Sequence, residues 1–600
     1  MKLSDYVFNF LSQLGVGRVF MLPGGGAMHL VDSLGKCEGL EFVSCLHEQA
    51  CAIAAEAHAR VTGKPGAVLV TTGPGGTNAM TGVAGAWLES TPCIFISGQV
   101  KRADLKTGLG IRQLGPQELD IVALVSPITK YAVMVMDPKT IRYHLEKAAT
   151  LAMSGRKGPV WIDIPLDVQG ATIDPETLPG LEPAAELPEE GAAGLEGAVE
   201  ATLGLLETSE RPVLLVGNGV RLAGAEAVFL RVVEALGIPV LTTWMGADLL
   251  ADAHPLCFGK PGTVAPRGAN FTIQNADLLI SVGARLDAAV TGFDQSRFAR
   301  GARKVVVDID PHEIAKLGMV VEVPIVADAR EFLERLLARV EVAGVKDRRP
   351  WLERCAQWKV RYPMVLPEYY ETKGCVNSFV LADVLAEVCS ERDLLVPGSS
   401  GAAIDTFWLG FRTRQGQRLF STGGLGAMGF GIPAALGACL GSEGRRTICV
   451  DGDGGFQMNI QELATIARLS LPIKFFVINN GGYASIRAMQ RNHFQGHLVG
   501  CDASSGLGLP DTLAVAAAYG LKTFRIKDQA TLRGDVQRVL EHPGPVVCEV
   551  MADPDQVISP RVSTVVRPDG GMSSRPLEDL WPFLDREELH SNMMIPLLPD

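Results

Sequence analysis

The amino-acid sequence predicts an α/β protein made of three domains, each built on a doubly wound parallel sheet. Three stretches of the chain alternate short apolar runs of strand length with helical stretches, and 66 glycines among 600 residues suit the turns between them. The length, with a hydrophobic content of 47%, exceeds one ordinary domain and alone suggests about three to four. We therefore expect three sheets joined by linkers.

The first unit spans residues 1–170. Its strand-like runs are GAVLVTT at 66–72, CIFISG at 93–98 and GPVWIDI at 158–164. Residues 171–194 then break the alternation with proline, glycine and acidic side chains, so we expect a linker there.

Two further units follow along the chain. The second covers 196–345, with strand-like runs at 211–220, 238–244, 276–286 and 304–314. A charged, irregular stretch at 345–374 bridges to a third unit at 376–560, and 561–600 remains as a C-terminal tail.

The run VDGDGGFQMN at 450–459, followed by the Asn479-Asn480 pair, predicts a metal-diphosphate site. Residues 448–455 are expected to form a buried strand and glycine turn, 457–470 a helix, and 471–480 the next strand. Asp453 and Asn480 then share the carboxyl edge of a parallel sheet, where their oxygens suit Mg²⁺ and glycine backbone suits phosphate. The alternative is a surface turn between core strands.

Composition narrows the classes of partner. A net charge of −12 without a basic cluster argues against nucleic acid or an anionic membrane surface. No apolar run is long enough to span a membrane, and the N-terminus is unlike a signal peptide, so we expect a cytoplasmic protein. The 12 cysteines and 10 histidines show no ligand spacing, so we expect reduced thiols and no zinc.

The GDGG run with its distal asparagine pair resembles the thiamin-diphosphate signature. The blocks at 22–34, 46–100, 421–438 and 450–490 are similar to the acetolactate-synthase branch of that family. The GSSG run at 398–401 and the tail at 576–593 also resemble acetolactate-synthase-like carboligases of branched-sugar and polysaccharide pathways. The resemblance implies, in chain order, a pyrimidine-binding, a middle and a diphosphate-binding domain. It also implies thiamin diphosphate and Mg²⁺ as cofactors, and a homodimer or homotetramer whose cofactor lies between subunits.

The resemblance assigns roles to individual residues. Glu48 matches the glutamate that hydrogen-bonds the cofactor's aminopyrimidine ring and promotes loss of the thiazolium proton. Gln117 matches a glutamine near the reacting carbon, and Met428 the methionine that props the cofactor into its bent form. The competing interpretations are a helix-start glutamate, a solvated loop glutamine and a core methionine.

The implied cofactor contacts lie on several loops. Ser399 and Ser400 stand where the family usually has Gln-His, so hydroxyls would donate to phosphate. The metal ligands are Asp453, Asn480 and Gly482. The full set around thiamin diphosphate is Pro23, Gly24, Gly25, Glu48, Thr72, Gly73, Asn78, Gly398, Ser399, Ser400, Gly426, Met428, Gly452, Asp453, Gly454, Gly455, Asn480, Gly482, Tyr483 and Ala484.

The middle unit has the layout with which acetolactate synthases hold a non-redox FAD. Glycine turns at strand ends suit a dinucleotide pyrophosphate, and acidic strand ends suit a ribose hydroxyl. Related enzymes also keep this domain with ADP or empty, so those alternatives stay open. The implied FAD residues are Arg156, Gly217, Gly219, Thr243, Gly283, Arg285, Asp308 and Asp328.

Four departures from the family all fall at acceptor-facing positions. Ala289 replaces the arginine that reads the carboxylate of a second 2-oxoacid, Met489 replaces a tryptophan, Pro116 a phenylalanine and Leu166 a lysine. Loss of that arginine removes strong charge-assisted bonds.

The functional prediction is a carboligase that decarboxylates pyruvate or a similar 2-oxoacid and transfers the acyl unit to a ketone, such as a small ketone or a keto-sugar nucleotide. The alternatives are acetolactate synthase proper, a 2-oxoacid decarboxylase or lyase, a flavin-dependent pyruvate oxidase and a noncatalytic homologue.

Overall fold

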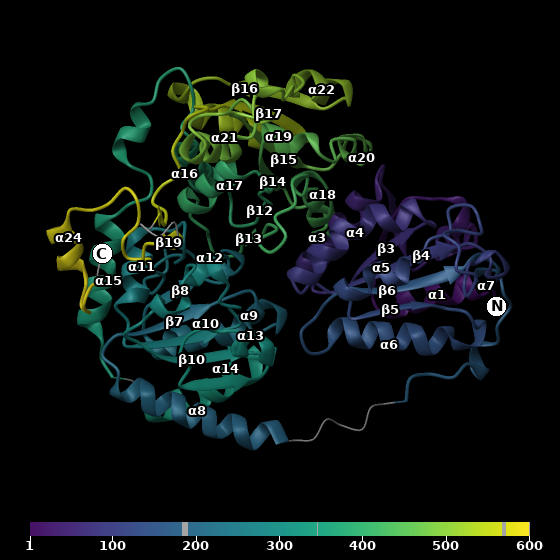
Figure 1. The fold of residues 1–600 in the computed structure, drawn as a ribbon, viewed down its shortest axis with the longest axis horizontal. Helices are drawn as coiled ribbons and strands as arrows, with labels where there is room; N and C mark the ends of the chain where they lie inside the picture. Colours follow the sequence, from purple (N-terminus) through teal and green to yellow (C-terminus); the bar gives the residue numbers. More distant parts are fainter. Residues whose placement is uncertain (183–189, 345, 567–571, 599–600) are drawn as a thin grey trace.

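Three lobes, each built on a parallel sheet, make up the chain (Figure 1). The structure, a computed structural model, describes residues 1–182, 190–344, 346–566 and 572–598. Four stretches lie outside the described residues: 183–189 in the predicted linker, 345 at the start of the predicted bridge, and 567–571 and 599–600 in the predicted tail. Within the described ranges no helix has the length and apolar character that crossing a membrane requires. The predicted fold class is confirmed, while the domain boundaries stay predictions.

The first sheet has six parallel strands in the order β2-β1-β3-β4-β6-β5. The strands are β1 (Arg18–Met21), β2 (Glu41–Ser44), β3 (Gly66–Val70), β4 (Cys93–Gln99), β5 (Tyr131–Met134) and β6 (Val160–Pro165). One face packs on α1 (Leu3–Gln13), α2 (Met28–Lys36) and α6 (Ile141–Met153). The other face packs on α3 (Glu48–Thr62), α4 (Pro74–Leu88) and α5 (Ile121–Val125), so the sheet is doubly wound.

The second sheet has five parallel strands in the order β11-β10-β9-β7-β8. They are β7 (Pro212–Val216), β8 (Val240–Thr242), β9 (Leu278–Val282), β10 (Arg303–Asp308) and β11 (Val323–Val326). Helices α8 (Glu190–Thr208), α10 (Glu226–Leu236) and α14 (Ala329–Ala343) cover one face. Helices α11 (Arg267–Gln274) and α15 (Arg349–Arg361) cover the other face, together with apolar side chains of the tail.

The third sheet has six parallel strands in the order β13-β12-β14-β15-β17-β16. They are β12 (Leu394–Leu395), β13 (Arg418–Leu419), β14 (Thr447–Gly452), β15 (Ile473–Asn479), β16 (Lys522–Ile526) and β17 (Val546–Met551). Helices α16 (Ser378–Val388), α17 (Gly401–Gly410) and α23 (Leu532–Glu541) cover one face. Helices α18 (Gly431–Gly441), α20 (Glu462–Arg468) and α22 (Thr512–Ala518) cover the other.

The single helix predicted over 457–470 is wrong. The chain instead forms α19 (Asp453–Gln457) and α20, separated by a turn at Asn459 with φ of 64°. The Asn459 amide donates to the Gly429 carbonyl at 2.9 Å, which holds this left-handed residue in place. Asparagine tolerates that conformation better than most residues, and the periodicity of the flanking apolar residues did not reveal the break.

A continuous apolar core joins the first and third lobes. It contains side chains of α3 and α4 from the first lobe and of α18 and α20 from the third. Helices α3 and α18 lie so close that a Cβ on Gly437 would be 1.9 Å from the Ala54 carbonyl oxygen. This contact leaves no room for a side chain. Helix α3, which begins at Glu48, is therefore fixed against the third lobe.

The C-terminal tail folds over the middle lobe. It contains the antiparallel pair β18 (Thr564–Val566) and β19 (Met572–Ser574) and ends near α24 (Arg586–Asn592), at the left of Figure 1. Asn270 donates to the Leu577 carbonyl at 2.8 Å, and Gln274 donates to buried Glu578 at 2.6 Å. These buried bonds make the tail part of the middle lobe's packing.

A buried carboxyl between two central strands makes a testable contribution to stability. Asp163 on β6 accepts hydrogen bonds from Ser97 at 2.5 Å and Gln99 at 3.0 Å, and burial raises its pKa to about 7. Because the folded pKa exceeds the unfolded value of about 4, this group favours folding at low pH. The stability that Asp163 contributes is fully present below about pH 4 and is lost as the pH rises through about 7, its pKa in the folded protein.

We expect Asp163→Asn, which mimics the neutral acid, to flatten the pH dependence of stability. The Tm of the wild type should fall more between pH 5 and pH 8 than the Tm of the variant, measured by calorimetry on both proteins. Parallel Tm curves would show that Asp163 does not titrate as stated.

Candidate functional site

A buried carboxylate and a buried amide meet at the carboxyl edge of the third sheet. Asp453 begins α19 after β14, its exposed fraction is 3%, and its carboxylate accepts from the Gly454 and Gly482 amides at 2.8 and 2.9 Å. Burial raises the pKa of Asp453 to about 6. Asn480 follows β15, and its buried Oδ1 has no hydrogen-bond partner among the described residues. An unpaired buried acceptor beside a carboxylate calls for a ligand of positive charge.

The chemistry of these donors fits Mg²⁺ bound with a diphosphate. Carboxylate, amide and carbonyl oxygens are hard ligands, and Mg²⁺ usually keeps substrate phosphate oxygens and water in its shell. The described residues hold no cluster of three His, Cys, Asp or Glu side chains that could bind a metal. A metal here would therefore rest on the oxygens of Asp453, Asn480 and the Gly482 carbonyl, together with oxygens of the ligand.

Glycines around this edge stand where no side chain fits. A Cβ on Gly454 would lie 2.3 Å from the Tyr483 ring, and one on Gly455 would lie 2.1 Å from the Ser400 hydroxyl. Gly482 has φ of 120° and faces the Cys501 carbonyl, 2.4 Å from where its Cβ would be. Tyr483 immediately precedes α21 (Ala484–His493). The edge thus presents backbone in place of side chains, as a phosphate site requires.

The two serines at the start of α17 differ in surroundings. The Ser400 hydroxyl donates to the buried carboxylate of Asp451, so its hydrogen is already engaged within the protein. Ser399 lines a cavity that the middle lobe also lines. Gly398 packs on Asp451, where a Cβ would be 2.2 Å from the carboxyl carbon. The predicted phosphate donation by Ser400 would therefore require that bond to Asp451 to break.

The loop that carries Gly426 and Met428 is tied to the first lobe. Arg60 on α3 donates to the Ser421 carbonyl at 2.8 Å, and Glu89 accepts from the Gly424 amide. Arg60 also pairs with Glu56, and all three charged side chains are buried. Gly426 has φ of 65°, and Met428 is half-buried. This network fixes the loop against the helix that begins at Glu48.

Glu48 lies at the carboxyl edge of the first sheet, where α3 begins after β2. Its exposed fraction is 6%, and its carboxylate accepts from the Asn78 amide on α4 at 2.9 Å. The other predicted residues of this edge follow β1 (Pro23, Gly24, Gly25) and β3 (Thr72, Gly73). Among the described residues of one chain, no hydrogen bond or ion pair joins Glu48 to Asp453. We call these two groups of residues half-sites, one at the edge of the first sheet and one at the edge of the third.

Gln117 belongs to the first half-site. It has φ of 63°, it is exposed, and its backbone packs on Gly73, where a Cβ would lie 2.4 Å from the Gln117 carbonyl oxygen. The Gln99 amide bonds both Asp163 and the Leu119 carbonyl, which anchors the loop that carries Gln117. A strained, anchored loop with an exposed amide suits a residue that faces a ligand.

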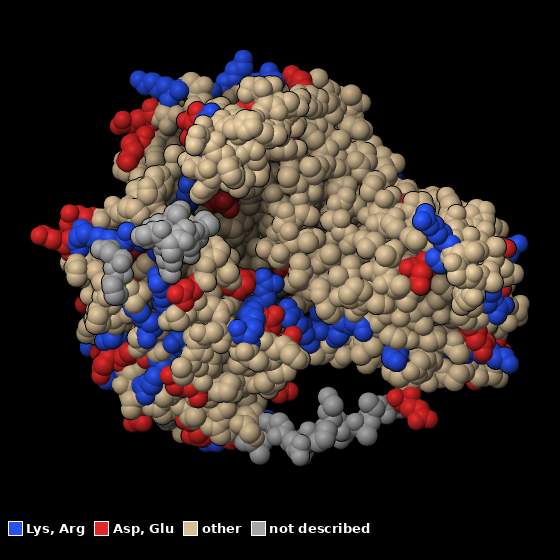
Figure 2. Space-filling model, viewed as in Figure 1, with Lys and Arg blue, Asp and Glu red and all other residues tan. Residues whose placement is uncertain are grey.

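A cavity of about 360 Å³ lies where the three lobes meet. On the face shown in Figure 2, a hollow separates the upper and lower-left lobes, with basic side chains beside it. Seven of the eight residues predicted for FAD line the cavity: Arg156, Gly219, Thr243, Gly283, Arg285, Asp308 and Asp328. Gly217 lies behind them, since a Cβ there would meet the Gly283 carbonyl oxygen at 2.3 Å.

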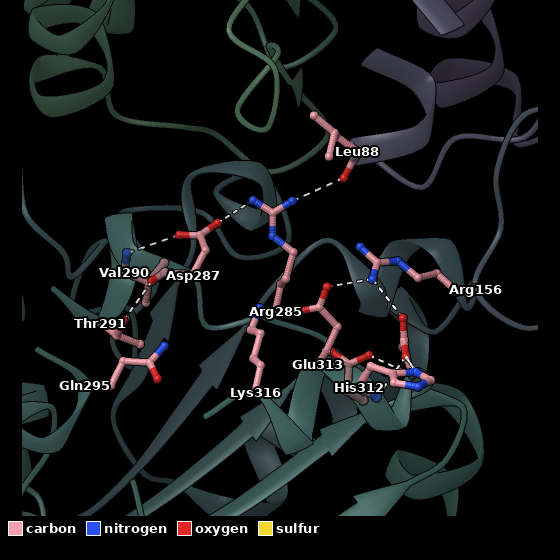
Figure 3. A network of polar contacts seen from close by, with 12 residues as sticks. Leu88, Arg156, Arg285, Asp287, Val290, Thr291, Gln295, His312, Glu313 and Lys316 are labelled. Carbon is pink, nitrogen blue, oxygen red and sulfur yellow. Dashed lines mark hydrogen bonds and ion pairs between the residues drawn. The ribbon is translucent and has the colours of Figure 1, made fainter. Parts of the chain in front are cut away.

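The cations of this cavity are held by protein groups (Figure 3). Arg156 pairs with Asp310 at 3.0 Å and Glu313 at 2.6 Å, and Arg285 pairs with Asp287 and donates to the Leu88 carbonyl at 3.2 Å. Lys157 donates to the Leu222 carbonyl at 2.7 Å. A ligand carboxylate would compete with Asp310, Glu313 and Asp287 for the two arginines, whereas the Lys157 partner is a neutral carbonyl.

Of the four departures from the family pattern, Ala289 lines this cavity. It belongs to α12 (Ala288–Thr291), which follows the Arg285–Asp287 pair. Pro116 and Leu166 lie on the first lobe, and Met489 lies on α21 with an exposed fraction of 44%. The described part of a single chain therefore does not bring these four positions together.

Sequence reasoning missed the part of the cavity that α17 forms. Ile404, Asp405 and Trp408 line it, opposite Trp244 and Met245 of the middle lobe. Trp244 and Trp408 stack with ring centroids 5.5 Å apart. The run from Gly401 to Gly410 looks like an ordinary apolar helix, and nothing in its pattern showed which face meets the middle lobe.

Comparison with known proteins agrees with this architecture. The chain matches three family models: the N-terminal thiamine-pyrophosphate (TPP) binding domain of thiamine pyrophosphate enzymes at 1–124, their central domain at 199–336 and their C-terminal TPP binding domain at 398–550. It is 34% identical to a probable acetolactate synthase large subunit of Methanocaldococcus jannaschii, over 95% of each chain. It is 35% identical to an acetolactate synthase large subunit of Corynebacterium glutamicum, over 96% of this chain and 90% of the relative. With these matches over nearly its whole length, the chain belongs to the acetolactate synthase family of thiamin-diphosphate-dependent, carbon–carbon bond-forming enzymes.

Proposed function

We propose that this chain is a Mg²⁺-dependent carboligase that takes pyruvate as donor and, as acceptor, a ketone that carries no carboxylate on its carbonyl carbon. The observation that carries the cofactor assignment is the unpaired Asn480 oxygen beside the buried Asp453 carboxylate. Pyruvate as donor is supported by the relatives, which are named acetolactate synthases. Bound thiamin diphosphate supplies the electron sink that lets a 2-oxoacid lose CO₂ and its acyl carbon attack a carbonyl.

In this proposal the chain's own residues bind, orient and move protons. Asp453, Asn480 and the Gly482 carbonyl hold the metal, and the glycine backbone of residues 452–455 contacts the diphosphate. Glu48, positioned by Asn78, exchanges a proton with the pyrimidine ring. Met428 would support the bound cofactor, and Gln117 would face the substrate. The other residues predicted for this cofactor shape the two sheet edges.

The absence of a cation at Ala289 supports the choice of acceptor. The bond between the carbonyl carbon and the carboxylate of pyruvate breaks and releases CO₂. The acetyl carbon then bonds to the ketone carbon, whose oxygen takes a proton to give a tertiary alcohol. An acceptor 2-oxoacid would need a free cation near its carboxylate, but Arg285, the arginine near Ala289, is paired with Asp287. A small ketone or a keto-sugar nucleotide meets the requirement, whereas the relatives' names favour acetolactate synthase as the second candidate.

The cavity also supports a bound flavin nucleotide, which we propose as a non-redox FAD. Asp308 at the end of β10 is half-buried and lines the cavity, burial raises its pKa, and only one of its carboxylate oxygens accepts a hydrogen bond among the described residues, from the Asp310 amide at 3.0 Å. The contact between Gly219 and Gly283 brings two backbone turns together at the carboxyl edge of the sheet, where dinucleotides bind. FAD extraction followed by absorbance spectroscopy distinguishes this ligand from ADP.

A homodimer, possibly doubled to a tetramer, would complete the site. Glu48 and Asp453 lie on separate half-sites, and both sheet edges expose apolar side chains that a second chain would bury. These exposed side chains are Met28, Leu46, Leu109, Ile111, Leu114, Met458, Ile486, Met489, Phe494 and Val499.

The two half-sites should respond differently to substitution. Glu48→Gln should still bind thiamin diphosphate but lose about two to four orders of magnitude in kcat, because the proton relay is gone. Asp453→Ala should instead weaken binding of the Mg²⁺–diphosphate group itself. Titration calorimetry and CO₂ release measured on both variants separate the two effects, and near-normal turnover in Glu48→Gln would refute its role.

The acceptor assignment predicts a specific product. Mass spectrometry after incubation of pyruvate with neutral ketones should detect acetyl-bearing tertiary alcohols that form faster than acetolactate. Ala289→Arg should shift the preference toward 2-oxoacid acceptors, since a charge-assisted bond contributes about 1.5–3 kcal/mol. Ala289→Met controls for the added bulk. Efficient acetolactate formation with no use of any ketone would contradict the assignment.

A further inference from the structure

The loop at 100–120, between β4 and α5, carries Gln117 at the carboxyl edge of the first sheet. Gln117 has φ of 63°, in the left-handed region that residues other than glycine seldom adopt. Its carbonyl oxygen lies against Gly73, where a Cβ would be 2.4 Å away. The exposed side chain of Gln117 therefore depends on contacts that hold the backbone around it in an unfavourable conformation.

One of these contacts comes from Glu118, the residue that follows Gln117. The exposed fraction of Glu118 is 4%, and its carboxylate accepts from the Lys106 and Leu114 amides at 2.6 Å each. Both bonds stay within the loop, so they give the loop its shape without attaching it to the sheet.

Gln99, the last residue of β4, attaches the loop to the sheet. Its exposed fraction is 1%, and its side-chain nitrogen donates to the Leu119 carbonyl at 2.8 Å and to the Asp163 carboxylate at 3.0 Å. Its side-chain oxygen accepts from the Val100 amide at 3.0 Å. Both N–H groups and the oxygen of this amide are engaged, so its orientation is fixed two residues away from Gln117.

Asp163 on β6 holds the Gln99 amide from the side of the sheet. It is fully buried, and its second oxygen accepts from the Ser97 hydroxyl at 2.5 Å, which in turn accepts from the Trp161 indole at 2.8 Å. The oxygen that faces Gln99 can accept whether or not the oxygen that faces Ser97 carries a proton. A buried polar network of this kind, with its members satisfied, is rigid.

We propose that Gln99 is a positioning residue for the reaction: through the Leu119 carbonyl it holds Gln117 in place at the first half-site, and Asp163 fixes its amide. This inference rests on the proposed function, in which Gln117 would face the substrate. Because its side chain is buried and both its N–H groups are engaged within the protein, Gln99 acts through Gln117 and not by touching the substrate.

A double-mutant cycle of Gln99→Met and Gln117→Ala tests this proposal, with kcat and KM for pyruvate measured by CO₂ release. Methionine has nearly the length of glutamine but cannot donate to the Leu119 carbonyl. Gln99→Met alone should lower kcat/KM about tenfold to hundredfold, because a small displacement of a group at the reacting centre costs that much. In the Gln117→Ala background the same change should cost less than about twofold, because the group it positions is already gone.

Two further measurements separate positioning from general loss of structure. The loss in Gln99→Met should divide between kcat and KM as it does in Gln117→Ala, since both changes act on one group. Ser97→Ala is the matched control, because Ser97 is as buried as Gln99 and bonds the same carboxylate, but has no hydrogen bond to the loop among the described residues. Its kcat/KM should stay within about twofold of the wild-type value.

Thiamin-diphosphate affinity, measured by titration calorimetry, should be retained in each variant and shows that it is folded. If Gln99→Met does not fold, Gln99→Glu carries the test, because it keeps the shape but turns an acceptor oxygen toward the Leu119 carbonyl. An unchanged kcat/KM in the Gln99 variant, equal losses in both backgrounds, or an equal loss in Ser97→Ala would overturn the role of Gln99 while the proposed function stands.

Two other outcomes reach the proposed function itself. Full kcat/KM in Gln117→Ala would remove Gln117 from the reaction and overturn this inference, although carboligation would stand. If the wild type releases no CO₂ from pyruvate with thiamin diphosphate and Mg²⁺, the proposed function fails and this inference fails with it.

Discussion

The unpaired Asn480 oxygen beside the Asp453 carboxylate is the constraint on which the functional account depends. Both groups are buried at the carboxyl edge of the third sheet, where burial disfavours the charged carboxylate. A core built only for stability would place apolar groups there. A cation bound with a diphosphate would resolve both problems at once, and the glycines around Asp453 leave space for phosphates.

The rest of the fold fixes the first and third lobes against each other. Helix α3 packs on α18 without room for a side chain at Gly437, and buried Arg60 ties α3 to the loop that carries Met428. The helix that begins at Glu48 is therefore fixed against the third lobe of the same chain. The three lobes together line a cavity whose two arginines are paired with carboxylates.

The sequence allowed the parallel-sheet class and the positions of Asp453, Asn480 and Glu48 to be predicted, because glycine turns and strand ends are local signals. It did not reveal the break at Asn459, since that residue is held by a bond to distant Gly429. The engagement of the Ser400 hydroxyl by Asp451 was also hidden, because it joins loops 51 residues apart. The part of the cavity that α17 forms was missed because only tertiary packing decides which face of that helix meets the middle lobe. Residue roles carried over from the resemblance stay predictions.

The central claim is that Glu48 of one chain and Asp453 of another complete a single site. Co-expression of Glu48→Gln and Asp453→Ala chains with different affinity tags, followed by purification of the mixed dimer, tests it most directly. Each variant alone has no intact site, whereas the mixed dimer carries one site with both native residues. The account predicts that carboligation reappears in the mixed dimer only. A mixed dimer as inactive as its parents would contradict a site shared between chains.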